Sequence, residues 1–362
     1  MDKRNGKNKF KALIILSLLL IGIACKDKNQ TEIVYLKDRE GMFKKWDELF
    51  PSYEIINSEF PPSHFFLALS SKGNFFLYNR KEEKIVLFDF RWNYVKEIAK
   101  KGEGPGEFQI PFPVWLDRKD NLYVNDIGKR VISLYSSPDY KFSGQFRVKS
   151  HISKAFIDPD GHFITFSLYN TPFLIKKYDR NGKILKETFK CKDEILRIFM
   201  ARFNPGGMAN LEDKGFLFVY PDRYEIYFYD YALNLQKIYK VKSFSKFYPV
   251  SPDFPQELSP YEISSEHSKW WDQFLHPCDI YILKGKFFMV SLLKSEGIGG
   301  TYYINFHDLK GKTYARGLEV PFKGKILWVM DDFIYVLEEE RFGEGDNIVP
   351  AKLHRYQLKK DL

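Results

Sequence analysis

One short loop has the residue types of a ligand site. Residues 102–108 read GEGPGEF and combine three glycines, one proline and two glutamates. A phosphate-binding loop would continue into Lys-Ser/Thr and a helix, and neither follows. The acids could instead bind a cation or a basic ligand. Alternatively, the loop could serve only to connect two strands, because its glycines and proline exclude a helix or strand interior. The candidate binding residues of this loop are Glu103, Gly104, Pro105, Gly106 and Glu107.

The remaining reactive side chains form no recognisable catalytic pattern. The seven histidines contain no pair separated by two or four residues, and the HExxH and GxSxG motifs are absent from the sequence. His276 lies two residues before Cys278, but this pair alone does not have metal-ligand spacing. A metal site could still be assembled by the fold from scattered acids, so the sequence identifies no catalytic residue and no cofactor, and leaves a metal open. Those acids are Asp117, Asp126, Asp158, Asp179 and Asp230.

The elements that must position these residues form a repeat. Six turns rich in Asp, Lys, Gly and Asn are each followed by a run of β-forming residues, such as Phe163–Phe166. A third strand, a second turn and a fourth strand follow in most units, and four short strands make one propeller blade. Six units between Phe65 and Leu358 therefore predict an all-β, six-bladed β-propeller. The first turns of the units are residues 71–74, 118–121, 158–161, 212–215, 283–286 and 329–332.

A propeller must close its ring, because open sheet edges promote aggregation. We expect Glu32–Leu36 to complete the last blade beside Leu353–Leu358. Tyr53–Ile56 is the competing candidate.

Two insertions interrupt the repeat. Ser259 and Glu262 are spaced as a capping box, which predicts a helix over 260–274 that carries Trp270 and Trp271 as candidate binding residues. That helix could equally plug the ring or cover a blade edge. A second short helix is expected within 192–203. The face that carries residues 100–113, 192–207 and 240–277 is the expected binding side.

The GEGPGEF segment, followed by Pro111 and the strand Asn121–Asp126, resembles the six-bladed β-propeller lipoproteins of Bacteroidetes-like bacteria, which are related to NHL-repeat propellers. The resemblance covers about residues 50–358. It implies a ring of blades around a central channel and no particular reaction. Some six-bladed propellers are metal-dependent lactonases or quinone-cofactor dehydrogenases, so an enzyme of either type stays open.

The N-terminus is typical of an export signal. A basic segment, residues 1–11, precedes a 13-residue apolar run, Ala12–Ala24, which suits a signal peptide better than a membrane span. The run ends at Cys25, and a small residue before a lone cysteine resembles a lipoprotein cleavage site. Gly22 stands where that site usually has Leu, so ordinary cleavage and an uncleaved anchor stay open. Lipid on Cys25 would tether the chain to a membrane without spanning it.

Composition limits the partners. Without residues 1–24, the chain has 51 basic and 46 acidic residues, interspersed along the sequence, which argues against nucleic-acid binding. Phe, Tyr and Trp make up 17% of the chain, which fits packed sheets or an aromatic-lined groove. Cys191 and Cys278 could pair in an oxidising compartment or remain separate thiols.

These observations favour three regions: a signal peptide at 1–24, a lipidated tether and first ordered segment at 25–50, and the propeller at 51–362. The expected protein is a lipid-anchored binding module of the bacterial cell envelope, periplasmic or on the cell surface. It would bind an envelope protein, a small molecule or a carbohydrate. A metal-dependent hydrolase, a quinone dehydrogenase and a purely structural envelope component are the alternatives.

Overall fold

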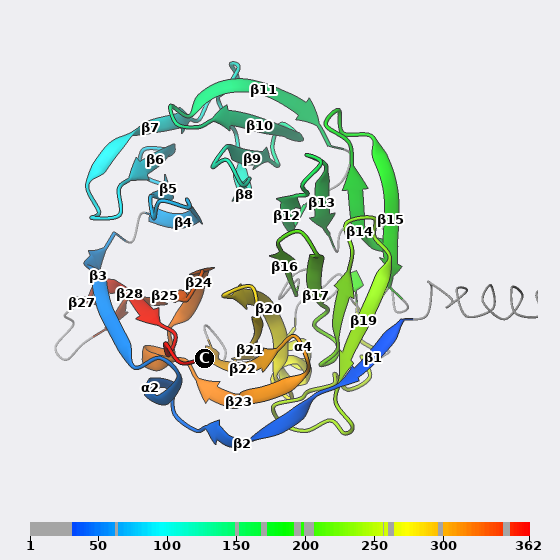
Figure 1. The fold of residues 1–362 in the computed structure, drawn as a ribbon. Coiled ribbons are helices and arrows are strands. Elements are labelled where there is room, and N and C mark those ends of the chain that lie inside the picture. Colours follow the sequence, from blue (N-terminus) through cyan, green and yellow to red (C-terminus); the bar gives the residue numbers. More distant parts are fainter. Residues whose placement is uncertain are drawn as a thin grey trace, which may run out of the picture. The chain divides into compact units, whose positions relative to one another are not determined.

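The described part of the chain folds as six sheets of four or five strands set around a common centre (Figure 1). Each sheet contains the four strands expected of a blade, and two sheets carry a fifth strand, so the predicted six-bladed β-propeller is confirmed. The four strands of each blade pair antiparallel, whereas β2 (Lys37–Phe43), the additional strand of the fifth blade, pairs parallel with its neighbour. Ile33–Leu362 form one compact unit. The computed structural model describes residues 31–61, 64–148, 152–167, 172–191, 197–198, 206–255, 257–259, 264–295, 300–342 and 348–362.

Blades 1 to 3 each run from the innermost to the outermost strand in chain order. Blade 1 consists of β4 (His64–Leu69), β5 (Phe75–Asn79), β6 (Lys84–Phe88) and β7 (Tyr94–Lys100). Blade 2 consists of β8 (Pro111–Leu116), β9 (Leu122–Asp126), β10 (Val131–Ser136) and β11 (Lys141–Arg147). Blade 3 consists of β12 (Lys154–Ile157), β13 (Phe163–Phe166), β14 (Phe173–Tyr178) and β15 (Ile184–Lys190).

Blades 4 to 6 also take strands from the N-terminal segment. Blade 4 consists of β16 (Gly207–Leu211), β17 (Gly215–Val219), β18 (Ile226–Tyr229), β19 (Leu235–Lys240) and β1 (Glu32–Tyr35). Blade 5 consists of β20 (His276–Leu283), β21 (Phe287–Ser295), β22 (Gly300–Asp308), β23 (Lys312–Glu319) and β2 (Lys37–Phe43). Blade 6 consists of β24 (Lys325–Met330), β25 (Phe333–Glu338), β28 (Ala351–Gln357) and β3 (Ser52–Phe60). The remaining elements are α2 (Trp46–Leu49), α4 (Ser265–Trp271), a 3-10 turn (Pro321–Lys323), β26 (Arg341–Phe342) and β27 (Ile348–Val349).

Ring closure differs from our first expectation. The segment beginning at Glu32 joins blade 4, and Leu36 donates its backbone N–H to the Lys240 carbonyl at 2.8 Å. The competing segment, Tyr53–Ile56, lies in β3 and pairs antiparallel with β28 of blade 6. Both segments are β-forming, so only the path of the chain around the outer edges decides between them.

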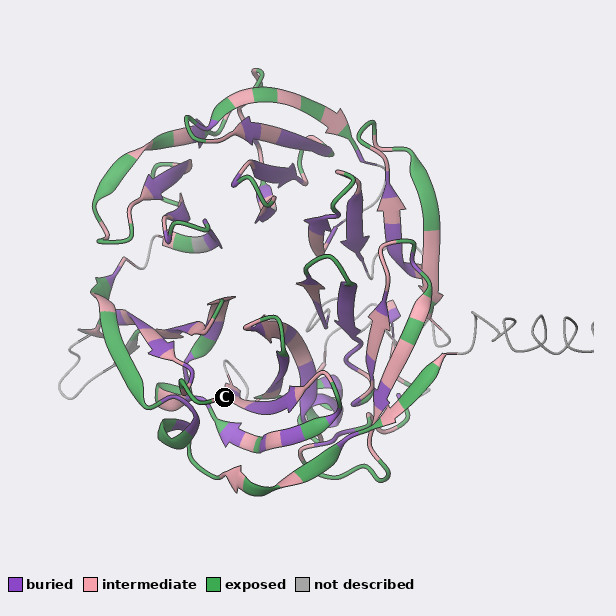
Figure 2. Cartoon of the chain, in the orientation of Figure 1, coloured by how far each residue is buried: buried purple, intermediate pink, exposed green. Residues whose placement is uncertain are grey.

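The core is divided among the blade interfaces. The second strand of a blade is covered on both faces, and β9, β13 and β17 are buried along their whole length, which explains their continuous apolar runs. The outer strand β11 instead alternates exposed and half-buried residues. Six apolar clusters of described residues fill the spaces between neighbouring blades. Figure 2 shows the exposed residues gathered on the outer strands and the buried ones on the strands inside them.

The insertions are only partly as predicted. Helix α4 begins at Ser265 with Ser264 as its N-cap, so the predicted cap at Ser259 is wrong, and residues 260–263 lie outside the described residues. Of the second predicted helix, 192–203, only residues 197–198 are described. Cys191 and Cys278 are separate thiols. No described helix is long and apolar enough to cross a bilayer.

The antiparallel order of strands divides the loops between two faces. We call the face with the first and third turns of each blade the turn face, and the opposite face, where the chain crosses to the next blade, the crossing face. The described parts of 101–110, 191–206 and 241–275 connect an outermost strand to the next innermost strand, so they share the crossing face, and residues 192–196, 199–205, 256 and 260–263 lie outside the described residues. This is the side that the sequence favoured for binding.

Candidate ligand groove between blades 2 and 3

A groove with a volume of about 580 Å³ lies between blades 2 and 3 on the turn face. That volume is within the usual range for small-molecule sites. Its walls come from the first turn and strands β9, β10 and β11 of blade 2, and from the first and third turns of blade 3. The lining residues are Asp117, Arg118, Lys119, Asn121, Tyr123, Leu134, Gly144, Gln145, Phe146, Ile157, Asp158, Pro159, Gly161, Phe163, Arg180 and Asn181.

Aromatic rings form the apolar part of the groove. Phe146 of β11 is half-buried, and its ring centroid lies 4.6 Å from that of buried Phe163 in β13. Tyr123 contacts Phe163 edge-on at 5.4 Å. Gly144, two residues before Phe146, has no atom within 4 Å of the position of a Cβ, so the groove is open above it.

Three cations surround this apolar floor. Arg118 and Lys119 belong to the first turn of blade 2, and Arg180 belongs to the third turn of blade 3; all three are exposed. Arg118 pairs with Asp213 at 2.7 Å, and both side chains are well exposed. Arg180 donates to the Asp160 carbonyl at 3.1 Å.

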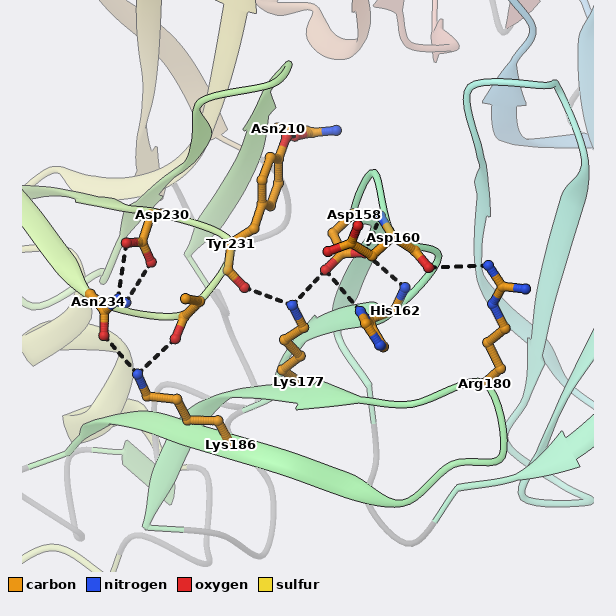
Figure 3. Close-up of polar contacts among 11 residues, drawn as sticks. Asp158, Asp160, His162, Lys177, Arg180, Lys186, Asn210, Asp230, Tyr231 and Asn234 are labelled. Atoms are coloured by element: carbon orange, nitrogen blue, oxygen red, sulfur yellow. Dashed lines mark hydrogen bonds and ion pairs between the residues drawn. The ribbon is translucent and has the colours of Figure 1, made fainter.

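Beside the groove, Asp158, Asp160 and His162 bring their ligand atoms within 4.8 Å of one another, a spacing that could hold a metal ion (Figure 3). The Asp158 carboxylate, however, already accepts from the Lys177 ammonium at 2.6 Å and faces the His162 ring at 3.3 Å. It also accepts the backbone N–H groups of Asp160 and His162. A resident cation, the Lys177 ammonium, therefore occupies the coordination space that a metal would need.

Lys177 also joins blade 3 to blade 4, because it donates to the Tyr231 carbonyl at 2.9 Å (Figure 3). Burial by itself raises the pKa of Asp158, but the hydrogen bonds from Lys177 and the His162 N–H outweigh burial and hold that pKa below its ordinary value. Asp158 is thus ionised at neutral pH, and its carboxylate is engaged in contacts within the fold.

The predicted loop, Lys101–Phe108, is a compact junction between β7 and β8. Glu107 accepts the Gly104 N–H at 2.9 Å within the loop, and Glu103 accepts from the Gln109 amide at 2.7 Å. Tyr135 donates to the Gly106 carbonyl at 2.8 Å, and a side chain at Gly106 would meet Phe142. Pro105 is exposed on this loop. These contacts explain the glycines by the close packing of the backbone at the blade junction. Glu103 stays exposed on the crossing face.

A buried acid anchors this junction from blade 2. Asp126 is 1% exposed and accepts four backbone N–H groups. The donors are Gln109, Ile110, Gly128 and Lys129. Asp126 is one of the scattered acids that the sequence offered for a metal site. Its carboxylate instead holds the loop in place.

Trp270 and Trp271 are each 3% exposed and pack into the apolar cluster between blades 3 and 4. Their rings therefore offer almost no surface to a ligand, and they help fill the apolar space between these two blades.

The sequence did not single out Asp222, a titratable residue on the crossing face. Burial raises the pKa of Asp222 to about 6, although the neighbouring Arg223 lowers it.

Other titratable groups are also held by the fold. Burial lowers the pKa of His276 and His307 to about 3, so both are neutral at pH 7. Burial raises the pKa of Cys278 to about 12, which keeps this thiol protonated.

Between the innermost strands, Lys154 of blade 3 pairs with Asp279 of blade 5, in space left by Gly207 of blade 4.

Sequence reasoning missed the groove because no short motif encodes it. Arg118 and Arg180 are 62 positions apart and look like ordinary turn residues. Their shared signal is a position directly after a turn aspartate, Asp117 or Asp179, whose side chain accepts backbone N–H groups of its own turn. Combined with the blade register, that signal could have placed both guanidinium groups on the turn face.

Fold and groove together define a six-bladed β-propeller with an inter-blade site. The chain belongs to the six-bladed β-propeller family DUF5128, whose model matches residues 64–268. No curated protein matches the sequence.

Solved structures share the fold at low identity. A predicted exported protein from Bacteroides fragilis is 14% identical, with a TM-score of 0.58 over 91% of this chain and 100% of that one. A DUF4221 family member from Bacteroides vulgatus is 12% identical, with a TM-score of 0.53 over 85% and 98%. Virginiamycin B lyase from Staphylococcus aureus is 10% identical, with a TM-score of 0.50 over 85% and 100%. These likenesses concern the fold alone.

Proposed function

We propose that this chain is an exported binding module, held at the bacterial cell envelope by lipid on Cys25, and that its ligand occupies the groove between blades 2 and 3. The observation that carries the binding role is the groove itself. It combines an apolar floor, exposed cations and amides, and about 580 Å³ of space. The two acids that line it, Asp117 and Asp158, already accept hydrogen bonds within the fold, which leaves the cations and amides to contact a ligand.

The export and anchoring part of the proposal rests on the N-terminal pattern. A basic segment, an apolar run of 13 residues and Cys25 follow one another in the order of a lipoprotein signal. Anchoring at Cys25 would leave a short polar link, residues 26–32, before the compact unit, on the periplasmic side or on the cell surface.

Anchoring can be tested by labelling cells with a palmitate analogue. We expect the full chain to be labelled and to fractionate with membranes, and Cys25→Ala to lose both properties. Cys191→Ala is the matched control, since Cys191 lies within the folded unit. Unchanged fractionation of Cys25→Ala would contradict the anchor.

The binding role can be tested without knowing the ligand. We expect Gly144→Leu to fill the groove without strain, because a Cβ there meets no atom within 4 Å. A library of small molecules and glycans is screened for compounds that raise the melting temperature of the full chain. The proposal expects compounds that stabilise the wild type and Gly144→Ala but not Gly144→Leu. Compounds that stabilise all three proteins equally, or no active compound at all, would count against it.

A further inference from the structure

The charge and hydrogen-bonding capacity left in the groove identify a class of ligand. This inference rests on the proposed function and extends it. Two acids line the groove, Asp117 and Asp158, and three cations do, Arg118, Lys119 and Arg180. What a ligand would meet depends on which of these groups still have capacity for a partner.

Both acids are already satisfied. Asp117 accepts the backbone N–H groups of Lys119 and Asn121, the Asn121 side-chain amide and the Tyr123 hydroxyl, at 2.8 to 3.2 Å. Asp158 has two backbone donors and Lys177. A carboxylate offers about four acceptor positions, so neither acid has much left for a ligand.

The cations, by contrast, retain most of their donors. A guanidinium carries five N–H donors, and the contacts described for Arg118 and Arg180 each use one or two of them. Among the described residues, the Lys119 ammonium makes no hydrogen bond or ion pair.

The Lys177 ammonium balances Asp158, and Asp213 pairs with Arg118. With both counted beside the lining residues, the groove still has one more cation than it has acids, and a surplus of donors.

Arg180 is placed by its surroundings. Its guanidinium lies against the backbone of Gly161, where a Cβ would overlap it, and it is held by the Asp160 carbonyl. Gly161 has a φ of +81°, so a glycine suits this position for both reasons. A guanidinium held in this way loses less freedom when it binds a carboxylate in a two-point contact.

The remaining lining supplies partners for the body of such a ligand. Gln145 and Asn181 are exposed amides that can bond to hydroxyl groups, and Phe146 presents part of an apolar ring. We infer that the groove binds an acidic carbohydrate, with the sugar carboxylate on Arg180 and its neighbouring cations and the sugar ring over Phe146.

The test is calorimetric titration of the purified full chain with trigalacturonate, its methyl ester, and inorganic phosphate. We expect trigalacturonate to bind at least about tenfold more tightly than the uncharged ester. Phosphate should bind weakly, because it lacks the sugar body. Arg180→Gln and Lys119→Gln should each weaken trigalacturonate binding about tenfold. Lys183→Gln, an exposed lysine on the same turn as Arg180 but outside the groove, should leave binding unchanged.

The outcomes separate this inference from the proposed function. Equal binding of acid and ester, or phosphate binding as tightly as trigalacturonate, overturns the acidic-sugar assignment. If Gly144→Leu still abolishes that binding, the groove itself stands. Binding that survives Gly144→Leu refutes the groove as well. Absence of binding by trigalacturonate overturns the assignment and leaves the library screen to decide the groove.

Discussion

Lys177→Met should destabilise the propeller far more than the loss of an ordinary surface ion pair. Asp158 is fully buried at its side chain and Lys177 is 13% exposed, so the variant leaves a carboxylate charge buried without its cation. Breaking a buried pair costs about 3–5 kcal/mol. Since Asp158 keeps its two backbone donors, we expect about 3 kcal/mol.

The size of the folded unit converts this loss into a melting shift. Unfolding entropy near 60 °C is about 2.1 cal/mol/K per residue, or about 0.7 kcal/mol/K for Ile33–Leu362. A loss of about 3 kcal/mol therefore lowers the melting temperature by about 4 °C. The control is Lys101→Met, which breaks the exposed pair with Glu83 and should cost at most about 1 kcal/mol.

The pH dependence of the difference provides a second readout. The folded pKa of Asp158 is lowered, so its stabilising contribution is present above the unfolded pKa and is lost as pH falls through the folded pKa. The gap between wild type and Lys177→Met should thus be widest above about pH 5 and shrink towards pH 3. Scanning calorimetry across pH measures both effects. Equal losses for Lys177→Met and Lys101→Met, or a wild type stabilised by millimolar calcium, would refute the view that Lys177 fills the cation position beside Asp158.

Three further predictions concern the stability of the fold, the closure of the ring and the burial of one thiol. Asp126→Asn should cost about 2 kcal/mol more than Asp89→Asn in urea unfolding, because Asp126 is buried beneath four backbone donors while Asp89 serves an exposed turn; similar losses would argue against this role. A chain that starts at Lys44 should keep its β-sheet circular dichroism, and one that starts at Pro61 should lose it, since only the second lacks β3; two folded chains would show that β3 is dispensable for closure. In a Cys191→Ser background, the Cys278 thiol, with its pKa near 12, should resist iodoacetamide at pH 8 until the protein is unfolded, and rapid native alkylation would contradict its burial.

The repeat was accessible to sequence reasoning because each blade solves the same local problem. A second strand buried on both faces must be apolar throughout, as in Phe163–Phe166, and the turn before it needs residues such as Asp158 that bond to their own backbone. Ring closure was not accessible in this way. Glu32–Tyr35 and Tyr53–Ile56 have the same local preference, and the choice depends on contacts with strands some 200 to 300 positions away.

The candidate site was harder to predict for a related reason. The GEGPGEF loop is conspicuous in sequence because a blade junction needs unusual backbone, and its contacts with Tyr135 and Phe142 explain that need. Trp270 and Trp271 drew attention as large rings in an insertion. The sequence pattern, however, does not distinguish rings that are buried between blades from rings that are exposed to a ligand. The groove depends on turn residues of two blades, such as Arg118 and Arg180, that become neighbours only in the ring.

The central claim is that ligand binds on the turn face, between blades 2 and 3. Hydrogen–deuterium exchange of the full chain, with and without saturating trigalacturonate or any active compound from the library screen, tests this directly. The account predicts slower exchange in peptides covering 117–123, 144–146, 158–163 and 180–181, and no change in 101–110 on the crossing face. Protection confined to 101–110 and the other crossing-face segments, with the groove peptides unchanged, would contradict it.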